Sequence, residues 1–385
     1  MECHETGAAP ERGRTPHREA MLWGSYAHGV LPLVALVLSI TAAAAEPSVT
    51  ILDLPFSARA MRGPGSAVSV SVATSGLLPL ARPKSPDPKA TLGAEPEDAA
   101  VVVVWGEGGG AALALKDGRI ETTLIGAEAI EGIAATETPR GALPGSRGIV
   151  LGPVSAALTR GEAGTLLTIR ERQPVAMSAE PKSVPIATHA VSAGAGAAFA
   201  PGRPHGARAE GTPLVFAVAV QGSRAPMLTA LGKTGAGWDV LGRSPAQAEG
   251  ALDIAAVGPF AGPGSVRIAT VMAPEGAGRL QLWAWDKSGF RLVGEAPGYT
   301  SRAAGASEAD LAAAIDTDAD DIPELALASA DRGSVAILDL KDGIRERSRI
   351  PLPAKAGFGL SVLGRGPQAQ LLVGLSDGRV AVVKP

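Results

Sequence analysis

The densest group of potential metal ligands is one acidic segment, Asp316-Thr317-Asp318-Ala319-Asp320-Asp321-Ile322-Pro323-Glu324. Carboxylates at alternate positions of a tight loop can point inward together, and hard oxygen ligands at this spacing suit Ca²⁺ better than softer metals. The expected ligands are the side chains of Asp316, Asp318, Asp320 and Glu324 and the backbone carbonyl of Ile322. The segment therefore predicts a calcium-binding loop that stiffens the fold rather than performing chemistry.

Two other interpretations of the acidic segment follow from its spacing. An EF-hand is excluded, because it needs glycine at the sixth position and glutamate at the twelfth, where this chain has Asp321 and Leu327. A solvated acidic turn that keeps a sheet edge soluble remains the alternative to calcium binding.

The sequence predicts no catalytic and no cofactor-binding residue. Gly374-Leu375-Ser376-Asp377-Gly378 matches the nucleophile elbow of serine hydrolases, but that elbow leads into a helix and needs a later histidine. Here a strand-like apolar segment follows, so we interpret the motif as a hairpin turn. His189 and His205 lie in Ala/Gly-rich chain without other ligand-type residues nearby, and we interpret both as loop residues.

The elements that must position these residues are short apolar strands separated by glycine turns. A unit of two apolar strands and one more polar strand recurs, with first-turn glycines at 110, 164, 278, 333 and 378 and a weaker equivalent near Ser223. The repeat of about 54 residues suits one four-stranded blade of a β-propeller. The sequence thus predicts an all-β protein with six blades, and a β-sandwich with coincidental turn spacing is the alternative.

The closure of the predicted ring involves both ends of the chain after residue 45. The final unit stops at Pro385 after its third strand, and Val49–Leu54 is a free strand able to complete that blade and remove two exposed sheet edges. We expect Ala67–Ala73 to be the inner strand of blade one and residues 80–97 to be a proline-rich excursion. A hairpin over Val68–Leu80 would instead make seven blades.

One segment gives conflicting signals. Ser307–Ile315 contains Ala, Leu and Glu after a serine cap, which favours a helix, whereas the repeat assigns its second half to an inner strand. Asp253–Val257, one unit earlier, resembles Asp310–Ala314 and fits a strand better, so we assign the strand.

The acidic segment, flanked by apolar strands, resembles the FG-GAP or VCBS-type repeat of integrin-α-like β-propellers, whose D-x-D-x-D-G-x-x-D calcium loop joins the first and second strands of a blade. The resemblance implies that the five expected ligands correspond to the family's ligand positions. Asp321 replaces the family's glycine, and Glu324 replaces an aspartate. The equivalent loop one blade earlier, Gly258–Gly264, contains no carboxylate.

The beginning of the chain has the features of an export signal. Val30–Ala45 is an uncharged apolar run preceded by arginines and ending in three alanines, which predicts a signal peptide over residues 1–45 and a single propeller domain over residues 46–385. The run is too short to favour a membrane anchor. Cys3 is the only cysteine, so the mature chain would have no disulfide, and we expect a periplasmic or extracellular protein without a membrane span.

Composition narrows the function without identifying a ligand. The net charge is −3 and no Lys/Arg block occurs, which disfavours nucleic acid as a partner. We expect an exported, non-enzymatic propeller that binds a protein or a polysaccharide. The alternative is an exported propeller enzyme, lactonase- or lyase-like, with its site in the central channel. Three or more polar or charged side chains meeting in that channel would favour the enzyme, and an apolar or open channel would favour the scaffold.

Overall fold

The computed structural model describes residues 47–76, 78, 100–162, 164–174, 184–222, 225–248 and 250–385. The chain divides into Met1–Ala45 and Glu46–Pro385, and only the second unit is described below. The predicted signal peptide, the proline-rich excursion over residues 80–97 and the turn at Ser223 lie outside the described residues.

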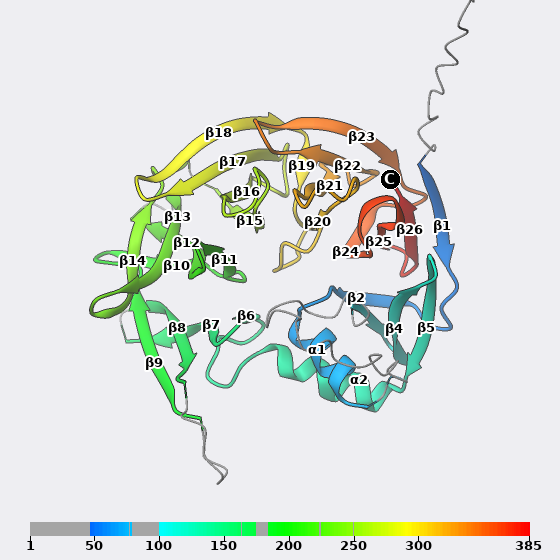
Figure 1. Ribbon diagram of the computed structural model, residues 1–385, viewed down its shortest axis with the longest axis horizontal. Coiled ribbons are helices and arrows are strands. Elements are labelled where there is room, and N and C mark those ends of the chain that lie inside the picture. Colours follow the sequence, from blue (N-terminus) through cyan, green and yellow to red (C-terminus); the bar gives the residue numbers. More distant parts are fainter. Residues whose placement is uncertain are drawn as a thin grey trace, which may run out of the picture. The chain divides into compact units, whose positions relative to one another are not determined.

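The described residues form six antiparallel sheets, which are the blades of a β-propeller arranged in a ring (Figure 1). In this architecture the inner strands face a central channel. Blade one contains β2 (Ala58–Arg62), β3 (Val101–Gly106), β4 (Gly109–Lys116) and β5 (Arg119–Ile125). Blade two contains β6 (Ile149–Leu151), β7 (Val154–Gly161), β8 (Gly164–Arg172) and β9 (Ile186–Ser192). Blade three contains β10 (Ala197–Phe199), β11 (His205–Ala209), β12 (Thr212–Gln221), β13 (Ala225–Thr234) and β14 (Gly237–Arg243).

The second half of the ring repeats this plan. Blade four contains β15 (Leu252–Gly258), β16 (Val266–Met272), β17 (Arg279–Asp286) and β18 (Gly289–Pro297). Blade five contains β19 (Tyr299–Thr300), β20 (Ala312–Ile315), β21 (Glu324–Ser329), β22 (Ser334–Asp339) and β23 (Arg345–Pro351). Blade six contains β24 (Ala356–Leu363), β25 (Gln370–Leu375), β26 (Val380–Lys384) and β1 (Ser48–Leu52). The predicted six-bladed propeller is therefore confirmed.

The predicted closure is also confirmed. Strand β1 pairs antiparallel with β26 over its whole length, from Ser48 opposite Lys384 to Leu52 opposite Val380. Val49 and Leu52 pack against the cores on the two sides of blade six. The first strand after the predicted signal peptide thus supplies the outer strand of the last blade and covers an edge that would otherwise be exposed.

Blade one corrects one expectation. Residues 67–73 do not form its inner strand but belong to α1 (Ala67–Thr74), and the inner strand is β2. The alternating Val-Ser pattern looks like a strand, but it also places Val68 and Val72 one helical turn apart, where both are fully buried while Val70 is exposed. Ser66 caps the helix by accepting a hydrogen bond from the Ser69 N–H. This helix excludes the seventh-blade hairpin.

Two further helical segments follow β5. They are α2 (Ala127–Ala134) and η2 (Ala135–Glu137), and they lie with α1 between blades one and two (Figure 1). A third short helical turn is η3 (Gly366–Gln368) in blade six. None of the helices in the described part of the chain has the length and apolar character needed to cross a membrane.

The cores lie between neighbouring blades. The middle strands carry small aliphatic residues on both faces, and Val101–Val104 of β3 and all of β21 and β25 are buried. A strand that is covered on both faces has a continuous run of apolar residues in its sequence. This explains why the repeat was visible in the sequence mainly through its second and third strands.

The inner strands of blades two, three and five are interrupted. In blade three the chain leaves the ladder after Phe199, opposite Ala219, and rejoins it at His205, opposite Phe216. Blade five leaves after Thr300 and rejoins at Ala312. In blade two, a bridge at Ala142 precedes the return of the chain in β6. Each interruption is an excursion at the channel, and the three excursions carry four of the six charged residues described next.

Candidate functional site

Six charged side chains meet in the central channel. They come from the inner strand of blade one, from η2 and from the three excursions, and we call them the charged layer: Arg62, Glu137, Arg147, Arg203, Glu308 and Asp310. In sequence they are spread over almost 250 positions. The propeller topology alone brings them together, because the inner strands of all blades line one channel.

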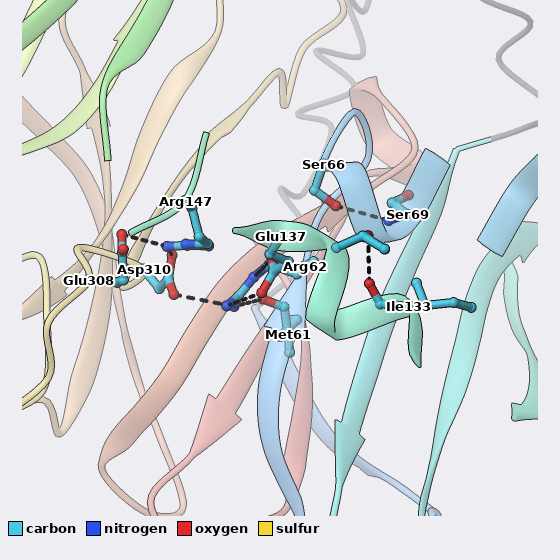
Figure 2. Close-up of polar contacts among 10 residues, drawn as sticks. Met61, Arg62, Ser66, Ser69, Ile133, Glu137, Arg147, Glu308 and Asp310 are labelled. Carbon is cyan, nitrogen blue, oxygen red and sulfur yellow. Dashed lines mark hydrogen bonds and ion pairs between the residues drawn. The ribbon is translucent and has the colours of Figure 1, made fainter. Parts of the chain in front are cut away.

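Asp310 is the centre of this layer (Figure 2). Its Oδ1 lies 2.5 Å from a terminal nitrogen of Arg147, and its Oδ2 lies 3.3 Å from a terminal nitrogen of Arg62. The same Arg147 nitrogen lies 3.0 Å from Glu308 Oε2. Arg62 also holds Glu137 with two nitrogens, one of them 3.0 Å from Glu137 Oε2. Two arginines therefore share three carboxylates.

Backbone contacts fix the segments that carry these side chains. The Asp310 carbonyl accepts a hydrogen bond of 2.8 Å from the Leu360 N–H of β24, which ties the blade-five excursion to blade six. Arg62 ends β2 and lies over the Trp105 ring, with its guanidinium carbon 5.2 Å from the ring centroid. The charged layer is thus held by three blades rather than by one flexible loop.

The surroundings of Arg147 and Arg203 shift the pKa values of the two side chains in opposite directions. Burial by itself lowers the pKa of Arg147, but Asp310 and Glu308 outweigh burial and raise it above its ordinary value. Burial lowers the pKa of Arg203, and the guanidinium of Arg147 lowers it further, with Asp310 and Glu308 acting in the opposite direction. Arg203 makes no hydrogen bond or ion pair with any described residue.

His205 follows Arg203 and begins β11. Burial lowers the pKa of His205 well below its usual range, and Arg203 and Arg147 lower it further, while the backbone of Ile254 as a hydrogen-bond partner raises it. The imidazole is therefore neutral at pH 7. His205 is mostly buried, with 9% of its surface exposed, and its lowered pKa makes it a weak base, so it is a poor candidate for a general base.

A cavity of about 1000 Å³ lies next to the charged layer. It extends toward the ends of the inner strands, with Leu151 and Val362 in its walls and Arg365 at its edge. A much smaller cavity of about 30 Å³ extends the other way, toward the beginning of β15. Arg203 and His205 line both cavities, and the other residues of the charged layer each line one of them. We call the charged layer the floor of the larger cavity.

The acidic segment lies where the family resemblance implies, between the first and second strands of blade five. The carboxylates of Asp316, Asp318 and Asp320 converge, with one oxygen of each within 4.8 Å of the others. Ile322 donates its backbone N–H to Asp320 Oδ1 at 2.8 Å. The structure thus brings together three of the expected calcium ligands in an arrangement that suits one hard cation.

Glu324 does not join this group. Its buried carboxylate lies 2.5 Å from Arg347 through Oε1 and accepts hydrogen bonds from the backbone and hydroxyl of Thr317 through Oε2. Arg347 also lies 3.1 Å from Asp318. Although partial burial raises the pKa of Asp318, the contact with Arg347 lowers it below its ordinary value overall.

A second arginine holds the other side of the loop. Arg365 lies 3.1 Å from Asp316 and also pairs with Asp321. Asp321 has a left-handed backbone, with φ of 64°, at the position where the family has glycine. Asp321 therefore adopts a backbone conformation that glycine favours, while arginines neutralise part of the charge of the loop.

The remaining sequence candidates are structural. Ser376 lies in the tight turn between β25 and β26, as predicted, and no helix follows it. The interpretation of His189 and His205 as loop residues is wrong, because both are on strands. His189 is on β9, the outer strand of blade two, and His205 is on the inner strand β11, so the fold does not bring the two histidines together. The disputed segment Ser307–Ile315 contains β20 and no helix, as the repeat predicted.

Sequence reasoning missed the charged layer. The available signal was the pair Glu308 and Asp310 beside a predicted inner strand, in the one segment where the helical and strand patterns conflicted. The arginines gave no signal by themselves, because isolated arginines are usually exposed.

No protein-family model matches the sequence, and no curated protein matches it either. Solved structures with related folds include the six-bladed β-propeller lectin of Aleuria aurantia, with 11% identity over 73% of this chain and 85% of the lectin and a TM-score of 0.34. AofleA from Arthrobotrys oligospora has 13% identity over 86% of this chain and 83% of its own, with a TM-score of 0.33. A luciferin-regenerating enzyme has 10% identity over 88% and 95%, with a TM-score of 0.37. At these values the similarities do not bear on what the chain binds, and the propeller assignment rests on the strand pairing.

Proposed function

We propose that this chain is an exported propeller that binds its ligand in the central cavity. The observation that carries the proposal is the charged layer at the floor of the cavity of about 1000 Å³. Binding sites of this size commonly combine apolar walls with a few fixed polar groups. A terminal group of a protein or of a polysaccharide is small enough to enter it.

Binding is supported better than catalysis. By the criterion set from the sequence, three or more charged side chains in the channel favour the enzyme, and six charged side chains line the cavities here. However, the three carboxylates are held by Arg62 and Arg147, and His205 is buried and neutral. A general acid or base needs a group free to exchange a proton with the substrate. The layer is built to position a ligand, and the enzyme remains the second candidate.

The site can be tested by blocking the cavity. Ala314 of β20 is exposed and lines it, so Ala314→Trp should fill part of the space. Ala246→Trp, at an exposed position away from the cavity, is the matched control. Small molecules that bind the wild-type protein, detected by ligand-observed NMR with a fragment mixture, should lose binding to the first variant only. Equal binding to both variants would refute the location.

We propose separately that the acidic loop binds Ca²⁺, as in FG-GAP or VCBS-type repeats. The support is the convergence of Asp316, Asp318 and Asp320 and the position of the loop within its blade. Glu324 would have to release Arg347 to contribute an oxygen, so we expect the three aspartates to provide most of the binding. The ion would stabilise blade five at the face where the cavity edge and Arg365 lie.

A further inference from the structure

We propose that the ligand of the central cavity is an amphipathic organic carboxylate, with its carboxylate against Arg203 and its apolar body along the cavity walls. This inference rests on the proposed function and specifies the chemical class of the ligand.

The first argument is the free donors of Arg203. Arg62 and Arg147 each pair with two carboxylates, whereas Arg203 has no described partner. An arginine has donors but no acceptor, so a fitting partner is an anion. A carboxylate fits the planar guanidinium with two parallel hydrogen bonds.

The second argument is the position of Arg203. Arg203 lines both cavities, whereas the Nε of Arg147 is buried without a hydrogen-bond partner and has almost no surface open to the cavity. A ligand in the larger cavity can therefore meet the donors of Arg203 but not the Nε of Arg147.

The walls of the cavity determine the rest of the ligand. Above the floor they contain mainly aliphatic and small side chains, including Ile149, Leu151, Leu360 and Val362. Val150 also lines the cavity with 67% of its surface exposed, which is unusual for a side chain of this type in a folded protein. The aliphatic part of these walls favours an apolar body of the ligand.

The test uses octanoate as the probe and isothermal titration calorimetry as the measurement. Octanoate should bind the wild-type protein, and Arg203→Gln should weaken binding by about 10- to 100-fold, the effect typical of losing a charge-assisted pair. Arg203→Lys should restore part of the affinity. Arg208→Gln, which changes an exposed arginine on the same strand as His205, should have no effect.

Uncharged and oppositely charged probes separate this inference from the proposed function. Octanol should bind wild type and Arg203→Gln equally, and octylammonium should bind neither. If octanol and octanoate bind in the cavity with no dependence on Arg203, the anion assignment is wrong while the cavity remains a binding site. Tighter binding of octyl phosphate than of octanoate would overturn the carboxylate assignment. Probe binding that survives Ala314→Trp would overturn both proposals.

The fold of the test variant can be checked directly. Because Arg203 has no described partner, Arg203→Gln should melt no lower than wild type. A lower melting temperature would show that Arg203 pairs within the free protein, and it would overturn the inference.

Discussion

Replacing Asp310 with asparagine is the sharpest perturbation of the charged layer. The change keeps the size of the side chain and its carbonyl oxygen, but it removes the charge that Arg147 and Arg62 share. Arg147 would retain Glu308, and Arg62 would retain Glu137. The substitution therefore leaves two positive charges partly compensated in a buried place.

The expected loss of stability follows from burial. Removing one partner of a fully buried ion pair costs about 3 to 5 kcal/mol. Asp310 is 21% exposed and each arginine keeps another carboxylate, so we expect a smaller loss of about 2 kcal/mol in the free energy of unfolding. In a double-mutant cycle with Arg147→Met, the two changes should not be additive, with a coupling energy of at least about 1 kcal/mol.

Urea unfolding of a purified protein that comprises residues 46–385 tests this prediction. Asp239→Asn is the control, because Asp239 is exposed on the outer strand β14. The m-value should be the same in all variants, so that midpoints report stability. If Asp310→Asn and the control are both within about 0.5 kcal/mol of wild type, the range typical of surface changes, the reasoning about the charged layer is wrong.

Three further predictions concern other parts of the molecule. Deleting residues 46–56 removes β1 and reopens the edge of β26, which should lower the melting temperature by roughly 10 °C, and an unchanged melting curve would contradict the closure. The pKa of His205 is lowered in the folded protein, so between that pKa and about pH 6.5 only the unfolded chain binds a proton at this residue. The free energy of unfolding should therefore fall as the pH decreases through that range, by at most about 1.4 kcal/mol per pH unit. His205→Gln should flatten this slope in urea titrations at several pH values. Millimolar Ca²⁺ should raise the wild-type melting temperature relative to a sample with chelator, because ligand binding stabilises the folded protein by RT ln(1 + [L]/Kd), and Mg²⁺ should raise it less. Asp318→Ala should abolish the increase. If Ca²⁺ does not shift the melting temperature of the wild type, the loop is a solvated turn.

The blades and their closure could be predicted because they depend on local patterns. Apolar strand pairs between glycine turns recur at a constant spacing, and a final unit without its fourth strand requires another segment such as Val49–Leu54 to complete it. The inner strand of blade one could not be predicted in the same way. Val68 and Val72 satisfy both an alternating and a helical pattern, and only the position of β2 in the sheet decides between them.

The channel could not be predicted for a different reason. Arg62 and Asp310 are 248 residues apart, and the pair Glu308 and Asp310 does not indicate which arginines it will meet. Their meeting depends on ring closure and on excursions whose direction is set by tertiary contacts such as the Leu360 to Asp310 backbone bond. The acidic loop could be recognised because all of its expected ligands are close together in the sequence. The arginines that contact the loop, Arg347 and Arg365, come from later segments.

The interrupted inner strands allow the lining of the channel to vary independently of the packing between blades, although most sheets couple the two. In a continuous strand, inserting a residue reverses which side chains face the core, so changing the lining of a channel would disturb the packing between blades. Here the chain leaves the ladder and returns to the same partner strand, as between Phe199 and His205 on β12. The excursions can therefore change in length and charge while the blade keeps its register. This makes them natural points of evolutionary variation, and an engineer could exchange the segment between Thr300 and Ala312 to give the same ring a floor of different chemistry.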